Sequence, residues 1–164
     1  MVCLYGCGAH KPAAVTQQQV LSQLSQPITA NLVVTIPDLT VEGRLERTGP
    51  EVYSFRVSAP QPLEGLAVKT EQQNVTLSFR GMEADLSCEP MPSCFAIAAF
   101  NAALDELSRQ QAEFRNTGEG GAVLTGSLDG ASFQLEVDNK GQPVLFTLPQ
   151  YELSIGCKQP EPSQ

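Results

Sequence analysis

The sequence predicts an α+β fold in which one antiparallel sheet is combined with a short N-terminal helix and one main helix. Three observations carry this prediction. Apolar and polar residues alternate over most of the chain, which is the period of strands with one buried and one wet face. Only two segments show helical spacing instead. The strand segments follow one another across short polar turns, as in an antiparallel meander.

The first predicted element is a short helix over residues 16–25. Thr16 is suited to cap its N-terminus, because a threonine oxygen can accept a hydrogen bond from an N–H of the first turn. Val20 and Leu24 recur at helical spacing, and Pro27 follows the last turn. These signals place both ends of the helix.

Five strands are predicted next, over residues 28–36, 39–48, 52–59, 65–71 and 74–82. In each strand the apolar residues occupy alternate positions, so they share one face. These residues are Ala30, Leu32, Val34, Ile36, Val41, Leu45, Tyr53, Phe55, Val57, Leu66, Val68, Val75, Leu77 and Phe79. We expect Phe55 and Val57 to point into the protein.

The main helix follows this meander. Pro90 and Pro92 stop the preceding strand, and Ser93 is a candidate capping residue for the helix. Its apolar stripe consists of Ile97, Phe100, Leu104 and Leu107. The charged residues that we expect to be solvated on its exposed side are Asp105, Glu106 and Arg109.

Three strands are predicted after the loop TGEGG, over residues 122–130, 131–139 and 143–155. The residues expected to point inward in the second of these are Phe133, Leu135 and Val137. In the last strand the apolar residues occupy even positions up to Leu148 and odd positions from Tyr151 onward. We expect a bulge at Pro149 and Gln150 to absorb this change.

The N-terminal stretch LYGC resembles a lipobox, the signal that directs acylation of bacterial lipoproteins. The residues that match its pattern are Leu4, Gly6 and Cys7. The resemblance implies that residues 1–6 end a signal peptide, that Cys7 carries the lipid, and that residues 7–15 form a tether. Because only six residues precede Cys7, we expect the reading frame to continue upstream of Met1. The alternative is a short apolar tail on a cytosolic protein.

The order of the elements resembles the lipoprotein-carrier superfamily of LolA, LolB and LppX-like proteins: a lipobox, a short helix, antiparallel strands, and a helix inserted before the last strands. The stretches VSAPQPLEGLAVKTEQQNVTLSFRGME and GASFQLEVDNKGQPVLFTLPQYELSIGC are similar to uncharacterised lipoproteins of clostridial bacteria. The resemblance implies a curved sheet over residues 16–158 that forms an incomplete, half-open barrel around the two helices. It also implies an apolar interior that can hold acyl chains. Residues 159–164 are expected to form a disordered tail.

The residues that would line such an interior come from the strands and from the main helix. The candidates are Val34, Ile36, Phe55, Val57, Leu77, Phe79, Phe133, Leu135, Phe146, Leu148, Ile97, Phe100 and Leu104. The sequence does not distinguish an apolar side chain that lines a cavity from one that fills a core.

Cysteine spacing leaves several pairings open. If Cys7 is acylated and the signal peptide is removed, three cysteines remain. Cys88 and Cys94 could close a small disulfide loop, and Cys157 could pair with either of them. Buried free thiols are a third possibility. A zinc site formed by the three cysteines and His10 is disfavoured because the spacing is wide, so we predict no metal site.

Composition and charge limit the possible functions. With 41% hydrophobic and 17% charged residues, the 164-residue chain suits one globular domain with its own core. The net charge of −8 disfavours nucleic acid and anionic lipids as partners, so attachment to a membrane would require the acyl anchor. His10 is the single histidine and lies on the tether, which leaves no Ser-His-Asp or Cys-His arrangement. We therefore predict neither an enzyme nor a cofactor.

Two functions fit these observations. In the first, the protein is an extracytoplasmic lipoprotein, anchored to the cell membrane, that binds a lipid or another apolar ligand on the concave face of the sheet. In the second, side chains fill the interior, and the protein is an interaction or accessory lipoprotein that docks on and supports a cell-envelope enzyme. The first is favoured because small residues of the main helix, such as Ala98 and Ala102, can leave an apolar space.

Overall fold

The computed structural model describes residues 14–71, 74–87, 96–109 and 112–158. Its helices are α1 (Gln17–Leu24) and α2 (Ala96–Arg109). Its strands are β1 (Ile28–Ile36), β2 (Leu39–Gly49), β3 (Val52–Ala59), β4 (Ala67–Glu71), β5 (Asn74–Phe79), β6 (Met82–Ser87), β7 (Glu113–Asn116), β8 (Ala122–Leu128), β9 (Ala131–Val137), β10 (Pro143–Leu148) and β11 (Leu153–Lys158). Two short 3-10 turns are η1 (Gln61–Leu63) and η2 (Pro149–Tyr151).

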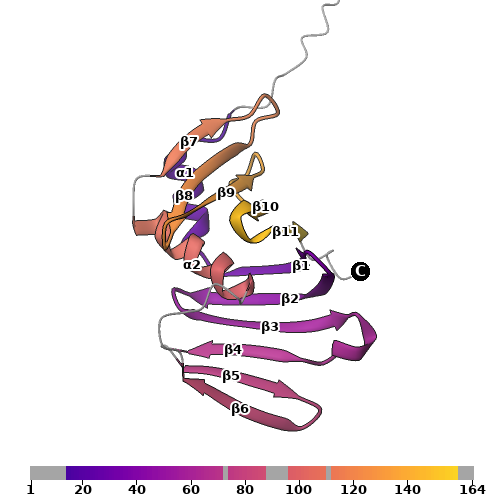
Figure 1. Ribbon diagram of the computed structural model, residues 1–164. Coiled ribbons are helices and arrows are strands. Elements are labelled where there is room, and N and C mark those ends of the chain that lie inside the picture. Colours follow the sequence, from indigo (N-terminus) through magenta and orange to yellow (C-terminus); the bar gives the residue numbers. More distant parts are fainter. Residues whose placement is uncertain (1–13, 72–73, 88–95, 110–111, 159–164) are drawn as a thin grey trace, which may run out of the picture.

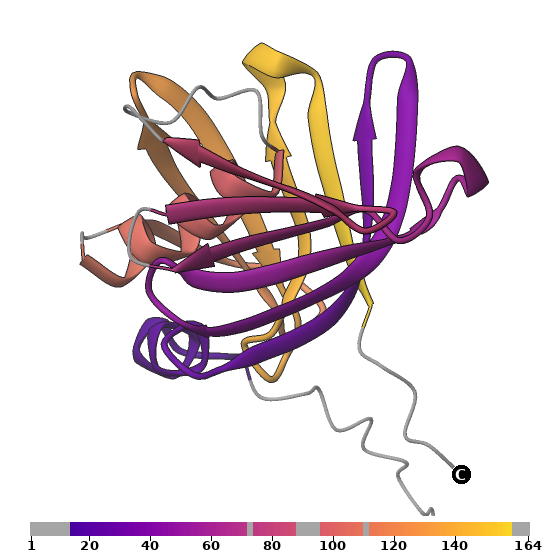
Figure 2. The ribbon, with the colours of Figure 1, turned by 90° about the horizontal axis from the view of Figure 1, so that it is seen from below.

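All of these strands form one antiparallel sheet, in the order β6-β5-β4-β3-β2-β1-β11-β10-β9-β8-β7. The strands β1–β6 and β7–β11 each form a sequential meander, and the two meanders meet where β1 pairs with β11. The sheet curves around α2 (Figure 1). In the view of Figure 2, β1–β6 run across the direction of β8–β11. An open, curved antiparallel sheet around a main helix confirms the predicted fold class.

Helix α1 begins at the predicted cap. The Thr16 hydroxyl accepts a hydrogen bond from the Gln19 N–H at 3.3 Å, and the Gln19 side-chain oxygen accepts one from the Thr16 N–H at 2.9 Å. This reciprocal pair satisfies N–H groups that the start of a helix leaves unpaired. Val20 and Leu24 are buried in the core, as is Val15 ahead of the helix. The cap therefore sets the register that brings the apolar side of α1 into the core.

The core lies on the concave side of the sheet. The residues predicted to point inward from their alternation are buried: Phe55, Val57, Phe133, Leu135 and Val137. The Phe146 ring packs edge-on against Phe100, with 5.5 Å between ring centroids, and lies 5.8 Å from the Phe133 ring. The Phe133 ring also covers Gly126, where an added Cβ would meet it at 2.5 Å. Aromatic rings thus fill the interior between α2 and the meander of β7–β11.

Strands β6 and β7 were not predicted. The segment expected as one strand over residues 74–82 is the start of a hairpin of β5 and β6. Arg80 and Gly81 adopt φ angles of 50° and 81° and reverse the chain there. Strand β7 follows the main helix, and Phe114 is its single apolar residue, so it carries no alternation that could predict it.

The predicted bulge at Pro149 is wrong. β10 and β11 are two antiparallel strands joined by η2, and Glu152 closes the turn in the left-handed conformation, with a φ of 50°. Leu148 lies opposite Leu153 in this hairpin, so even positions of β10 share a face with odd positions of β11. The apolar residues change from even to odd positions because the chain reverses direction here, and not because of a one-residue shift within a single strand. A register shift does occur in β10 next to Pro143, and Val144 there is 43% exposed.

Candidate functional site

The candidate cavity residues fall into three settings. Six are enclosed in the core, at 0% or 1% exposure: Phe100, Leu104, Phe133, Leu135, Phe146 and Leu148. Five border an apolar cavity: Val34, Ile36, Phe55, Val57 and Ile97. The other two, Leu77 and Phe79, are partly buried on β5. The apolar cavity therefore lies under β1–β5, and the candidates on β9 and β10 are packed in the core.

The cavity has a volume of about 210 Å³ and lies between the concave face of β1–β5 and the first turn of α2. Its lining residues are Val34, Ile36, Leu39, Val41, Tyr53, Phe55, Val57, Leu63, Leu66, Val68, Val75, Ala96, Ile97 and Ala98. Tyr53 is the one residue of this lining whose side chain carries a polar group. Alternation in the sequence places Val41, Val68 and Val75 on the correct face. Leu63 lies on η1, where no periodicity could predict it.

The cavity exists because the first turn of α2 presents short side chains. Ala96 and Ala98 border the space, and Ile97 is the single larger residue that the helix contributes to the lining. Further along the helix, Phe100 and Leu104 are fully buried in the core. A cavity lined by aliphatic and aromatic side chains can bind apolar molecules.

The cavity extends to one end of the strands, where hairpin turns carry exposed apolar side chains. Ile36 and Leu39, at the β1–β2 turn, line the cavity and are 36% and 38% exposed. Tyr151, which is 42% exposed, lies on the β10–β11 turn. The two turns are neighbours because Thr35 pairs with Ser154, and they lie side by side at the top of Figure 2. We call Ile36, Leu39 and Tyr151 the apolar rim.

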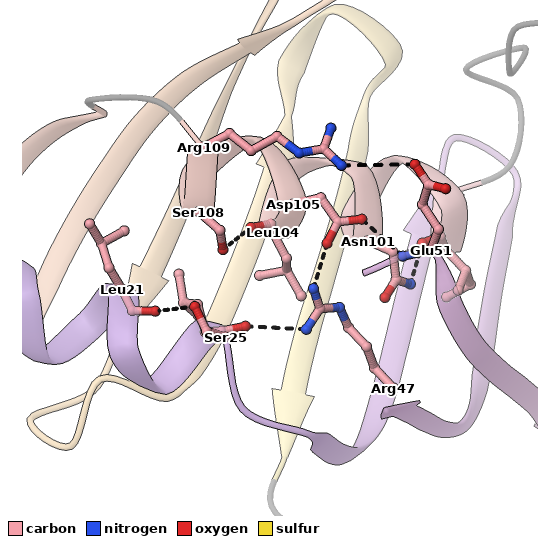
Figure 3. Close-up of polar contacts among 11 residues, drawn as sticks. Leu21, Ser25, Arg47, Glu51, Asn101, Leu104, Asp105, Ser108 and Arg109 are labelled. Atoms are coloured by element: carbon pink, nitrogen blue, oxygen red, sulfur yellow. Dashed lines mark hydrogen bonds and ion pairs between the residues drawn. The ribbon is translucent and has the colours of Figure 1, made fainter. Parts of the chain in front are cut away.

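A buried ion pair attaches the C-terminal half of α2 to the sheet (Figure 3). Arg47 Nη2 on β2 lies 2.5 Å from Asp105 Oδ1, and the two side chains are 1% and 7% exposed. Arg47 Nη1 also donates to the Leu24 carbonyl, and Asp105 Oδ2 accepts from the Glu51 N–H. The expectation that Asp105 is solvated is therefore wrong, because its charge is neutralised inside the core. Arg109 is exposed as expected, 3.8 Å from Glu51.

A larger hollow lies on the outer face of β1–β3. Its volume is about 740 Å³, and its walls carry both acidic and basic side chains. These charged residues are Glu42, Glu46, Glu64, Arg44, Arg56 and Lys158. Arg44 and Glu46 pair with each other at 3.1 Å. An apolar ligand would bury little apolar area there, so we assign the candidate site to the smaller cavity.

Titratable side chains give no indication of other chemistry in the described part of the chain. Among these residues, no group of three or more His, Cys, Asp or Glu side chains could hold a metal ion. Cys157 on β11 is a free thiol, and burial raises its pKa to about 12, which makes it a poor nucleophile at neutral pH. Glu83 and Asp85 are exposed on the edge strand β6. The predicted sites that lie outside the described residues are Cys7, His10, Cys88 and Cys94.

Comparison with known proteins bears on the fold. No protein-family model matches the sequence, and no curated protein matches it. In the described residues, neither helix has the length and apolar character needed to cross a membrane.

Two solved structures resemble the chain. An uncharacterised conserved protein from Thermus thermophilus aligns with a TM-score of 0.54 and 14% identity, over 89% of this chain and 86% of that one. A LolA superfamily protein from Nitrosomonas europaea aligns with a TM-score of 0.41 and 14% identity, over 85% of this chain and 75% of that one. The first likeness shows that the two chains share a fold.

Proposed function

We propose that this protein is an extracytoplasmic lipoprotein, anchored to the cell membrane through an acylated Cys7, that binds a lipid or another apolar ligand in the cavity between β1–β5 and α2. One observation carries the binding proposal: the cavity is lined by apolar side chains and continues into the apolar rim. The lipobox residues Leu4, Gly6 and Cys7 carry the proposal of an anchor.

An acyl chain fits this cavity better than a whole phospholipid. Each CH2 group that moves from water into an apolar environment contributes about 0.8 kcal/mol. A volume of about 210 Å³ is smaller than the sites that enclose drug-sized ligands, so it holds only part of a long chain. The remainder would lie against Ile36 and Leu39, which are already exposed at the edge of the cavity. We therefore propose a ligand with a single apolar chain.

Filling the cavity is expected to weaken binding. Ala98→Leu should bind a pyrene-labelled fatty acid about tenfold more weakly than the parent chain, because the larger side chain occupies space that the ligand needs. Ala102→Leu is the matched control, since it enlarges a side chain on the same helix outside the cavity lining. Fluorescence titration measures the affinity of all three chains. Binding that Ala98→Leu leaves unchanged would contradict the site, and a parent chain that does not bind would contradict the function.

Removing the acylated cysteine is expected to release the protein from the membrane. When the gene is expressed with its natural upstream sequence, the parent protein should fractionate with the membrane and Cys7→Ser with the soluble extracytoplasmic material, because two acyl chains provide stable attachment. Cys157→Ser is the control, since this thiol lies within the folded domain. Immunoblots of the separated fractions measure the distribution. A cytosolic parent protein, or an in-frame stop codon directly before Met1, would refute the anchor.

The second candidate function is an interaction or accessory lipoprotein that supports a cell-envelope enzyme. It is favoured by the part of the interior in which Phe100, Phe133 and Phe146 pack against one another. The polar hollow on the outer face of β1–β3 would then be the surface that contacts the partner. A parent chain that binds no fatty acid supports this candidate.

A further inference from the structure

We infer that the apolar cavity ends in a buried hydrogen-bonding subsite, formed by Thr70 and Asn101, that takes the hydroxyl end group of an otherwise apolar ligand. The inference rests on the proposed function of this cavity. It adds the chemical class of the ligand, a long-chain alcohol or a lipid with a free hydroxyl, and the direction in which that ligand lies.

On the sheet side, the row of residues that lines the cavity continues into a polar residue, Thr70. Leu66 and Val68 line the cavity, and Thr70 is the next position of β4 on the same face. Thr70 lies directly opposite Tyr53 on β3 and Val75 on β5, both of which line the cavity. Its side chain is 6% exposed, and its hydroxyl has no hydrogen-bond partner. This end of the cavity lies away from the apolar rim.

Helix α2 shows the same change from apolar to polar residues. Ile97 lines the cavity, and Asn101 and Asp105 follow it at intervals of four residues, on the same side of α2. Asp105 pairs with Arg47, which lies opposite Tyr53 in the sheet. Asn101 therefore lies one helical turn from a residue of the cavity lining and one turn from the ion pair. It is 2% exposed; its Nδ2 donates to the Ile97 carbonyl at 2.8 Å, and its Oδ1 has no hydrogen-bond partner.

A hydroxyl is the group that suits these two side chains. Buried polar groups are nearly always paired, and an unpaired one is costly, so Thr70 and Asn101 mark a place for a polar atom. An alcohol can donate its hydrogen to the Asn101 oxygen and accept a hydrogen bond from Thr70. A carboxylate only accepts, and it would bring a second negative charge close to Asp105. With its hydroxyl at the polar end, the ligand would extend its apolar chain past Val68 toward the rim.

The test is a competition between ligands that differ only in the hydroxyl. Decanol should displace a pyrene-labelled fatty acid from the parent chain at roughly tenfold lower concentration than decane, because decane leaves both polar atoms unpaired. Thr70→Val and Asn101→Leu should abolish this preference while decane still binds. Thr35→Val is the matched control, because Thr35 is an exposed threonine on the opposite face of the sheet, and it should keep the preference.

The outcomes separate this inference from the proposed function. If decanol and decane displace the probe equally, or if Thr70→Val keeps the preference for decanol, the subsite is refuted while the cavity stands. If neither compound displaces the probe, the subsite and the proposed function are both refuted. Thr70→Val removes an unpaired hydroxyl and keeps the shape of the side chain, so it should unfold at the same or a higher urea concentration than the parent. A lost preference in that stable variant supports the subsite.

Discussion

Replacement of Asp105 by alanine is expected to lower the free energy of unfolding by about 3–5 kcal/mol, because the Arg47 charge would stay buried without a partner. The substitution also removes the acceptor of the Glu51 N–H. Both effects act where α2 contacts β2 and the turn between β2 and β3, so the helix would lose these polar contacts with the sheet. Urea titration followed by circular dichroism measures the loss.

Two controls isolate the role of the buried charge. Arg47→Met combined with Asp105→Leu fills the same space with apolar side chains, and it should recover most of the stability that Asp105→Ala loses. Arg109→Ala removes the exposed partner of Glu51 at 3.8 Å, and it should change the free energy of unfolding by less than about 1 kcal/mol. An Asp105→Ala variant as stable as the parent would mean that Arg47 reaches water once its partner is gone.

The second large effect is expected for Leu104→Asp. Leu104 is 0% exposed on α2, so the substitution places a carboxylate in an apolar interior and removes the contacts of the leucine. We expect a loss of about 4 kcal/mol or more, which is a large part of the stability of an ordinary domain. Ser108→Asp, one turn further along and exposed, should change the stability by less than about 1 kcal/mol. A thermal melt of Leu104→Asp that matches the parent would refute the packing of α2.

Alternation predicted most of the sheet because the concave face of β1–β3 and β8–β11 is largely buried. Phe55 and Val57 on β3, and Phe133 and Leu135 on β9, alternate with exposed or half-buried neighbours, and they point inward as expected. The Thr16 cap was equally readable, since its partner Gln19 lies within the same turn. Both signals depend on residues that are close together in the sequence, and the structure confirms both.

Features that depend on distant parts of the chain were not predictable in this way. Arg47 occupies an inward position of β2, but a charge inside a core is acceptable only with a partner. That partner, Asp105, lies 58 residues later on a helix whose charges read as solvent-exposed. The turn at Arg80 and Gly81 was missed for another reason. Arginine seldom adopts a positive φ, so the pair does not resemble the Asn-Gly and Asp-Gly signals of hairpins.

The sequence predicted that the candidate site is lined by apolar side chains, but not which part of the interior it occupies. Phe55 borders the cavity and Phe133 is enclosed in the core, although both are phenylalanines on alternating strands. The two phenylalanines differ in their surroundings because α2 presents different residues to the two parts of the interior. Alanines face the cavity, whereas Phe100 meets the other rings. The tertiary fold determines which residues of the helix lie against which residues of the strands.

The pairing of β1 with β11 affects how the chain folds. Within each meander, all of the paired strands are neighbours in the sequence, whereas Val34 and Ile155 face each other across β1 and β11 from positions more than a hundred residues apart. Closing a loop of that length costs chain entropy before any contact between these strands returns free energy. We therefore expect each meander to form before the two join along β1 and β11.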